Sequence, residues 1–245
     1  MLAERNEPTI VRYSVPTFLE RWTVPDTGAT VPEAPSHDQA LELLKAVLAH
    51  WVARTRRDAA VYRDIAIRVR QDKPQVGFDP DISLVEPAPP GPYDLDSVCL
   101  WKAGNTPPTV AIEVVSKNHP YKDYTEIPDR CAATGVAELV VFDPMLVGPR
   151  AHGGPHLVQL WRRSADGAFD RVHAGDGPVW SDHLSAWLVA VEGARLLRVS
   201  DDRDGKRLWP TPEETERAAK DAAHAEAERA KARVAELEAE LRRRR

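Results

Sequence analysis

The spacing of apolar residues predicts an amphipathic helix near the N-terminal end of the chain. Between about His37 and Arg56 the apolar side chains recur every three or four positions, so they share one helical face. Ser36 or Asp38 is placed to cap this helix. Residues 1–36 contain several prolines and are expected to be mostly irregular. The apolar face consists of Leu41, Leu44, Val47, Leu48, Trp51 and Val52.

Four later runs have the length and composition of strands. The first alternates apolar and polar positions, which predicts a half-buried strand. The other three are almost entirely apolar, as expected for strands that are buried on both faces. In chain order these runs are residues 61–70, 79–85, 109–115 and 138–143.

A second helix and a hairpin complete the predicted domain. Residues 123–134 predict a helix that ends at Gly135, because glycine favours the backbone conformation that closes a helix. Residues 156–162 and 169–172 predict a hairpin across a short turn that contains glycine. The order helix, three strands, helix and strand predicts a mixed α/β sheet with at least one crossover helix.

The C-terminal segment, residues 211–245, differs in composition from residues 1–210. It consists mainly of Ala, Glu, Arg and Lys. Thr211 can cap a helix there, with Pro212 at the first helical position and Glu214 completing a capping box. We therefore expect one domain followed by a charged helical tail.

This tail carries a short heptad pattern. Val234, Leu237 and Leu241 occupy a and d positions, and three alanines extend the seam until Lys220 and Glu216 interrupt it. The pattern fits a short coiled coil, and it equally fits a solvated helix without a partner. We expect a homodimer that forms through the tail or through the domain.

Composition limits the class of protein. Apolar residues make up 42% of the chain, which is enough for a sizeable core. No run of about 18 apolar residues occurs, so no membrane span is expected, and the first residues lack the pattern of a signal peptide. Cys99 and Cys131 are far apart and form no CxxC motif, which argues against a disulfide framework or a zinc site. A cytoplasmic protein is expected.

The charge distribution bears on the choice of partner. The net charge is −5, and the tail contains nine acidic and nine basic residues, so the acidic excess belongs to residues 1–210. A domain that binds DNA through its phosphates usually presents a basic face, so this balance argues mildly against DNA as a partner. A metal site built from carboxylates is itself acidic, which weakens that objection.

Two carboxylates lie inside the predicted buried strands. Asp81 follows Pro80 near the start of one run, and Glu113 lies in the middle of another. An ionised carboxylate in a buried strand costs several kcal/mol unless it is paired, and a divalent cation is a suitable partner. A Pro-Asp strand followed by a strand with Glu and a nearby Lys is the arrangement of a magnesium-dependent phosphodiesterase site.

Two lysines are candidates for the catalytic lysine side chain. Alternate residues of a strand face the same side, so Glu113, Val115 and Lys117 share a face if the strand continues that far. On this geometry we favour Lys117 over Lys122 as the group that places the attacking water or neutralises developing charge. Asp123 is expected to cap the following helix or to hold Lys122 in place.

A structural interpretation competes with this one. Asp81 is explained equally well as a turn residue after proline, and Glu113 as the partner of a structural arginine. For Asp81 alone, the structural interpretation is favoured. For both carboxylates together with Lys117, a functional site is favoured, because acidic side chains are rarely unpaired in buried strands.

The stretch from Glu113 to Pro144 resembles the Uma-two family of endonucleases, which belongs to the PD-(D/E)XK superfamily with a restriction endonuclease-like fold. The similarity extends over about residues 16–190, and Pro80-Asp81 resembles the Pro-Asp strand of the family. The matching segments are Glu113-Val114-Val115-Ser116, Asp123, Gly135-Val136-Ala137-Glu138 and Asp143-Pro144.

This resemblance implies a metal site that contains Asp81, Glu113 and Val115. The usual lysine of the superfamily falls on Val115, and a lysine that family members often carry in the following helix falls on Ile127. Lys117 and Lys122 are then the local substitutes, as residues close to the position of the missing lysine.

We therefore expect a restriction endonuclease-like α/β domain that hydrolyses phosphodiester bonds in DNA with Mg²⁺ or Mn²⁺. The alternative is a binding or scaffold protein that kept the fold, lost catalysis and assembles through its helical tail. A basic groove beside Glu113 would favour the enzyme, and an acidic cleft would favour the scaffold.

Overall fold

The structure, a computed structural model, describes residues 12–13 and 35–244. The chain divides into two compact units, Met1–Trp209 and Pro210–Arg245, which we describe separately. The segment that was expected to be irregular, residues 1–36, lies mostly outside the described residues. None of the described helices is long and apolar enough to cross a membrane.

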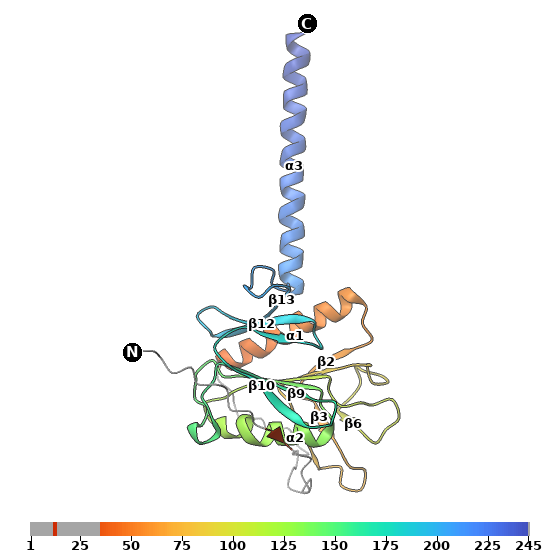
Figure 1. Ribbon diagram of the computed structural model, residues 1–245. Coiled ribbons are helices and arrows are strands. Elements are labelled where there is room, and N and C mark those ends of the chain that lie inside the picture. Colours follow the sequence, from red (N-terminus) through yellow and green to blue (C-terminus); the bar gives the residue numbers. More distant parts are fainter. Residues whose placement is uncertain (1–11, 14–34, 245) are drawn as a thin grey trace, which may run out of the picture. The chain divides into compact units, whose positions relative to one another are not determined.

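A seven-stranded mixed sheet forms the centre of the first unit (Figure 1). Only β7 and β8 among its neighbouring strands run parallel, and a helical connection links them, as expected for a crossover. The other neighbouring pairs are antiparallel. In spatial order the strands are β1 (Arg12–Tyr13), β10 (Phe169–Gly175), β9 (Val158–Arg163), β8 (Glu138–Phe142), β7 (Val110–Val114), β5 (Ile82–Val85) and β2 (Ala60–Arg63).

Helix α1 (Pro35–Thr55) packs its apolar side chains against one face of this sheet. Figure 1 shows α1 on one side of the sheet and α2 on the other. A three-stranded antiparallel sheet contributes to the core around α1, and Trp51 stacks on Trp209 there at a ring distance of 4.8 Å. The strands of this second sheet are β11 (Val179–Ser181), β12 (Ala186–Val191) and β13 (Leu196–Ser200).

The opposite face of the central sheet is covered by a two-part helix. Its first part, η2 (Lys122–Glu126), is a π-helical turn, and its second part, α2 (Ile127–Thr134), ends at Gly135 in the left-handed region. Ile127 and Cys131 are buried on this side together with Leu139 and Trp161 of the sheet.

A third sheet lies on the α2 side and consists of β4 (Gly77–Phe78), β3 (Ala66–Arg68) and β6 (Ser97–Cys99). A short 3₁₀ turn, η3 (Arg150–His152), lies in the loop after β8. The mixed α/β class and the crossover helix are confirmed.

Three predicted element boundaries are wrong. Residues 61–70 form two strands in different sheets, because Asp64 takes a positive φ of 53° and turns the chain between them. The strand predicted at residues 79–85 begins at Ile82, and Asp81 lies just before it. The helix predicted at residues 123–134 begins as a π turn.

The second unit contains the long helix α3 (Pro212–Arg243). The predicted capping box is confirmed, because the Thr211 hydroxyl accepts a hydrogen bond from the Glu214 N–H and the Glu214 carboxylate accepts one from the Thr211 N–H. Pro212 lies in the first turn as predicted.

Candidate active site

The two carboxylates selected from the sequence lie side by side on the central sheet. Strands β5 and β7 are antiparallel neighbours, and Ile82 is paired with Ile112. This register places Asp81 opposite Glu113, so both side chains point to the α2 side of the sheet. Glu113 is fully buried and Asp81 is 7% exposed.

The main chain of β7 holds the Asp81 carboxylate in place. Its Oδ2 atom accepts a hydrogen bond from the Val114 N–H at 2.7 Å. The His37 Nε2 atom, from the first turn of α1, lies 2.6 Å from the Val114 carbonyl oxygen and 3.8 Å from Asp81 Oδ2. Helix α1 and strands β5 and β7 are thus tied together at the site.

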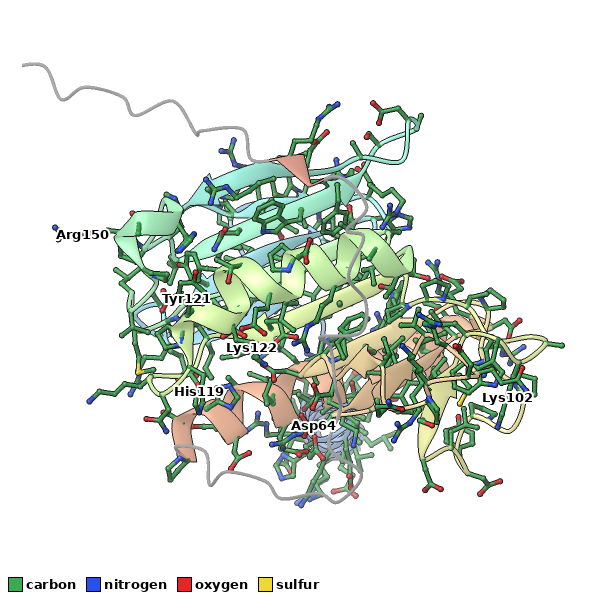
Figure 2. The ribbon with its side chains drawn as sticks, turned by 90° about the horizontal axis from the view of Figure 1, so that it is seen from below. Asp64, Lys102, His119, Tyr121, Lys122 and Arg150 are labelled. Carbon is green, nitrogen blue, oxygen red and sulfur yellow. The ribbon has the colours of Figure 1, made fainter. Side chains whose placement is uncertain are left out.

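Lys122 is the lysine that reaches the carboxylates. Its Nζ atom lies 3.2 Å from Glu113 Oε2 and 3.4 Å from Asp123 Oδ1. Figure 2, which views the α2 side, labels Lys122 at the start of the helical segment that covers the sheet. The π turn carries both Lys122 and Asp123 at this point, and such turns often occur at functional sites.

Burial and mutual repulsion shift the pKa values of the site carboxyls upward. Burial raises the pKa of Glu113 to about 8 and that of Asp123 to about 7. Burial, and then the charge of Glu113, raises the pKa of Asp81 well above its ordinary value. The charge of Glu113 in turn raises the pKa of Lys122. Three buried carboxyl groups therefore surround one ammonium group, whose single positive charge cannot balance all three in their ionised form.

The oxygen atoms at the centre fit a hard divalent cation. Glu113 Oε1 is buried and accepts no hydrogen bond from a donor among the described residues. Within that part of the chain no group of three or more His, Cys, Asp and Glu side chains has the arrangement of a metal site. Magnesium is commonly held by one or two carboxylates with water and substrate phosphate, so Asp81 and Glu113 suffice for that mode.

The geometric reason for preferring Lys117 fails in the structure. Strand β7 ends at Val114, so the alternation of side chains does not continue to Lys117, which lies exposed in the following loop. Val115 is buried in the apolar core on the α2 side, and its N–H donates to the Phe142 carbonyl. Its apolar side chain has no metal-binding atom, so Val115 could contribute only its main-chain oxygen.

Two residues at the site were not assigned this place from the sequence. His37 belongs to a helix whose start was predicted, but nothing in the local pattern indicates that it reaches β7. Asp123 was expected to cap a helix or to hold Lys122, and the ion pair agrees with the second of these. Its proximity to Glu113 depends on the π turn, which leaves no clear signal in the local sequence.

A comparison with known protein families identifies the family of this chain. The family described as "Uma2: Putative restriction endonuclease" matches residues 26–150, which include Asp81, Glu113 and Lys122. The chain belongs to the Uma2 family. No curated protein matches it. Membership supports a nuclease function in general terms, and a nucleic acid as the substrate.

One solved structure is similar to this Uma2 chain over much of its length. It is described as a putative nuclease belonging to DUF820 from Anabaena variabilis ATCC 29413. The two chains are 15% identical, and the alignment covers 64% of this chain and 76% of the other, with a TM-score of 0.44. The resemblance to the Uma-two family noted from Glu113 to Pro144 is confirmed by the Uma2 match.

Proposed function

We propose that this Uma2 protein is a metal-dependent endonuclease that hydrolyses phosphodiester bonds in DNA. The observation that carries the proposal is the position of Asp81, just before β5, opposite Glu113 of the adjacent strand β7, with Lys122 bound to Glu113. We further propose that residues 1–210 form the nuclease domain and that the remaining helix is a separate segment.

Asp81 and Glu113 are the proposed ligands of Mg²⁺ or Mn²⁺. When bound, such a cation polarises the scissile phosphate and lowers the pKa of a coordinated water. The protein's own contribution is orientation: the Val114 N–H fixes Asp81 Oδ2, and the sheet register fixes Glu113 beside it. Both carboxylates are therefore held in place before any ligand enters.

Lys122 is the proposed catalytic lysine. Its raised pKa keeps the side chain protonated, so it acts as a hydrogen-bond donor and a positive charge rather than as a general base. In that state Lys122 can orient the attacking water or stabilise the negative charge that develops on the phosphate. The exposed Lys117 lacks contact with either carboxylate in the described structure and is assigned no direct role.

Calorimetric titration with MgCl₂ and MnCl₂ tests the metal site. We expect the wild type to bind and the isosteric variants Asp81→Asn and Glu113→Gln to lose binding. Asp94→Asn, in an exposed loop, is the control and should bind as the wild type does. Each protein is then assayed for cleavage of plasmid DNA, single-stranded DNA and RNA.

The outcomes separate enzyme from scaffold. Metal binding and DNA cleavage that are both lost with Asp81 and Glu113 support the proposal. A wild type that binds no metal at millimolar concentration, with or without a non-cleavable DNA, would favour the scaffold protein. If the protein cleaves RNA and not DNA, the proposed catalytic site would still be supported, but the proposal that DNA is the substrate would be wrong.

A further inference from the structure

Helix α3 exposes a stripe of large apolar side chains. No described residue of the helix from Pro212 to Arg243 is buried. Val234, Leu237 and Leu241 are 55%, 43% and 64% exposed. A long helix that is polar on its other sides and apolar along one stripe gains stability when that stripe is covered.

The stripe follows a heptad repeat. With Val234 at an a position, Leu237 falls at d and Leu241 at the next a. Toward the N-terminal end the same register places alanine at d, a and d, until charged residues interrupt it. The continuous seam consists of Ala223, Ala227, Ala230, Val234, Leu237 and Leu241.

We propose that α3 pairs with α3 of a second copy of this chain, in parallel and in register. In that arrangement each large apolar residue meets its own counterpart, so the largest side chains are buried against one another. A β-branched residue at a and leucine at d, as in Val234 and Leu237, is the combination that favours two-stranded parallel coiled coils. This proposal does not depend on the proposed nuclease activity.

The flanking charges match this arrangement. In a parallel pair each g residue lies beside the e residue of the next heptad in the partner helix. Glu226 at g then faces Lys231 at e of the second copy, and Arg233 at g faces Glu238 at e of the second copy. Both contacts, each made twice in the dimer, join opposite charges.

Within one helix these charges already make local pairs. Lys231 lies 2.9 Å from Glu228, and Arg233 lies 3.0 Å from Glu236. Both pairs are exposed and therefore weak, so the same charges remain able to interact with a partner helix. The interhelical contacts therefore set the register and orientation, while the seam supplies the affinity.

The ends of the seam limit its length. Lys220 at a and Glu216 at d would bring like charges together, so pairing begins near Ala223 and ends near Leu241. At 1.5 Å per residue this seam is about 27 Å long. We therefore expect a dimer of moderate affinity, with a Kd on the order of micromolar.

An antiparallel pair is the competing arrangement. With Val234 opposite Leu237, it would place Leu241 against Ala230, so the largest side chain would face the smallest of the seam. It would also pair e with e and g with g, which brings Lys231 beside Glu238 of the second copy. The two orientations therefore respond differently to exchange of the e charges.

Sedimentation velocity on the full chain, over about 1–200 μM, tests the dimer. We expect the wild type to shift from monomer to dimer in this range, and Leu237→Lys to remain monomeric. Ala239→Lys is the matched control, because it adds the same charge two residues away at an f position, and it should dimerise as the wild type does. A monomeric wild type, or a Leu237→Lys variant that dimerises normally, would overturn the proposal.

A charge exchange tests orientation. The variant Lys231→Glu/Glu238→Lys opposes like charges in a parallel pair, so we expect at least a tenfold weaker homodimer. Mixing it with Glu226→Lys/Arg233→Glu should restore dimerisation as a heterodimer, which also shows that both helices are intact. An exchanged variant that still forms the homodimer with wild-type affinity would overturn the parallel orientation in favour of the antiparallel one.

Discussion

Glu113 is a buried acidic residue whose ionisation destabilises the folded protein unless a cation lies beside it. It is fully buried, it binds Lys122 through one oxygen, and its other oxygen has no donor among the described residues. The protein therefore stabilises the protonated form of Glu113 unless a cation compensates its charge. Stability and metal binding should both depend on pH through this residue.

The first prediction concerns stability without metal. The pKa of Glu113 is about 8 in the folded chain and 4.5 as the ordinary value, so the folded state binds more protons between these pH values. Stability therefore falls as pH rises from about 4.5 to 8. Glu113→Gln removes this cost, and in EDTA we expect it to be about 1–3 kcal/mol more stable than the wild type at pH 8.

Urea unfolding of both proteins at pH 5 and pH 8 measures this difference. Near pH 5 the two should have nearly equal free energies of unfolding, because Glu113 is then mostly protonated in the folded wild type. Glu192→Gln, at an exposed position, serves as the control and should follow the wild type at both pH values. A difference that does not grow with pH would contradict the raised pKa.

The second prediction separates the two lysines. Lys122→Met removes the ammonium group that contacts Glu113, and we expect plasmid cleavage to fall about 10²–10³-fold, the range for loss of one preorganised electrostatic contact. Lys117→Met removes an exposed charge and should change the rate less than about threefold. Initial rates at saturating Mg²⁺, with metal binding checked by calorimetry, provide the comparison. An equal loss of cleavage rate in both variants would show that Lys117 also acts in the reaction.

Elements buried in the central sheet were the most predictable part of the fold. Apolar runs such as residues 109–115 and 138–143 form β7 and β8 because few other structures bury every side chain. The sequence analysis placed Asp81 and Glu113 in separate runs, and their opposition depends on the pairing of β5 with β7, which the local sequence does not specify. The strands of residues 179–200 were not predicted, because β11 has only three residues and β13 includes the polar residues Arg198 and Ser200 although it is buried throughout.

The lysine could not be placed from local sequence. The strand ends after Val114 where the predicted face required it to continue, and a π turn then brings Lys122 back over the sheet. Both events depend on how the helix packs against β7 and β8. The spacing of apolar residues predicts individual helices and strands, and it does not predict how they pack against one another.

Glu138 joins three elements and carries the third prediction. Its carboxylate is fully buried and accepts hydrogen bonds from Arg162 at 2.9 Å, from the Ser181 hydroxyl and from the Asp182 N–H at 3.1 Å. Glu138→Ala leaves these donors without their acceptor, so we expect a loss of about 3–5 kcal/mol in the free energy of unfolding.

Urea denaturation measures that loss, and Glu192→Ala on an exposed turn is the control for removing a glutamate, with an expected change below about 0.5 kcal/mol. Because β11 follows β9 and β10 in the chain and is joined to β8 through Ser181, the variant should lose protection from hydrogen exchange first in β11 to β13. A loss below about 1 kcal/mol would show that Glu138 is not an essential link between the sheets.

At the scale of the whole molecule, the proposed dimer has a consequence for the product of cleavage. A parallel α3 pair that begins near Ala223 places the N-terminal ends of both helices at the same end of the pair, and there the chain of each copy continues into the unit that carries the proposed site. Two sites held together can cut both strands of a duplex in one encounter. The fourth prediction is that wild-type protein converts supercoiled plasmid directly to linear DNA, whereas Leu237→Lys accumulates nicked circles.

Gel analysis of an early time course, at equal site concentration, distinguishes these products. Ala239→Lys is again the control and should produce linear DNA as the wild type does. Total strand scission should differ less than about twofold between the variants, because neither substitution touches the site. If the monomeric variant produces linear DNA at the wild-type rate, double-strand cleavage does not require the dimer and the prediction is wrong.

The division of the site between sheet and helical turn also has an evolutionary consequence. The carboxylates belong to β7 and to the residue before β5 and are buried, whereas Lys122 belongs to a partly exposed turn. A descendant can therefore lose the lysine through one substitution and keep the fold together with both proposed metal ligands. It can regain a lysine from a neighbouring position of the same helical segment. Lineages with this architecture should shift between cutting and merely binding nucleic acid more readily than they lose the fold.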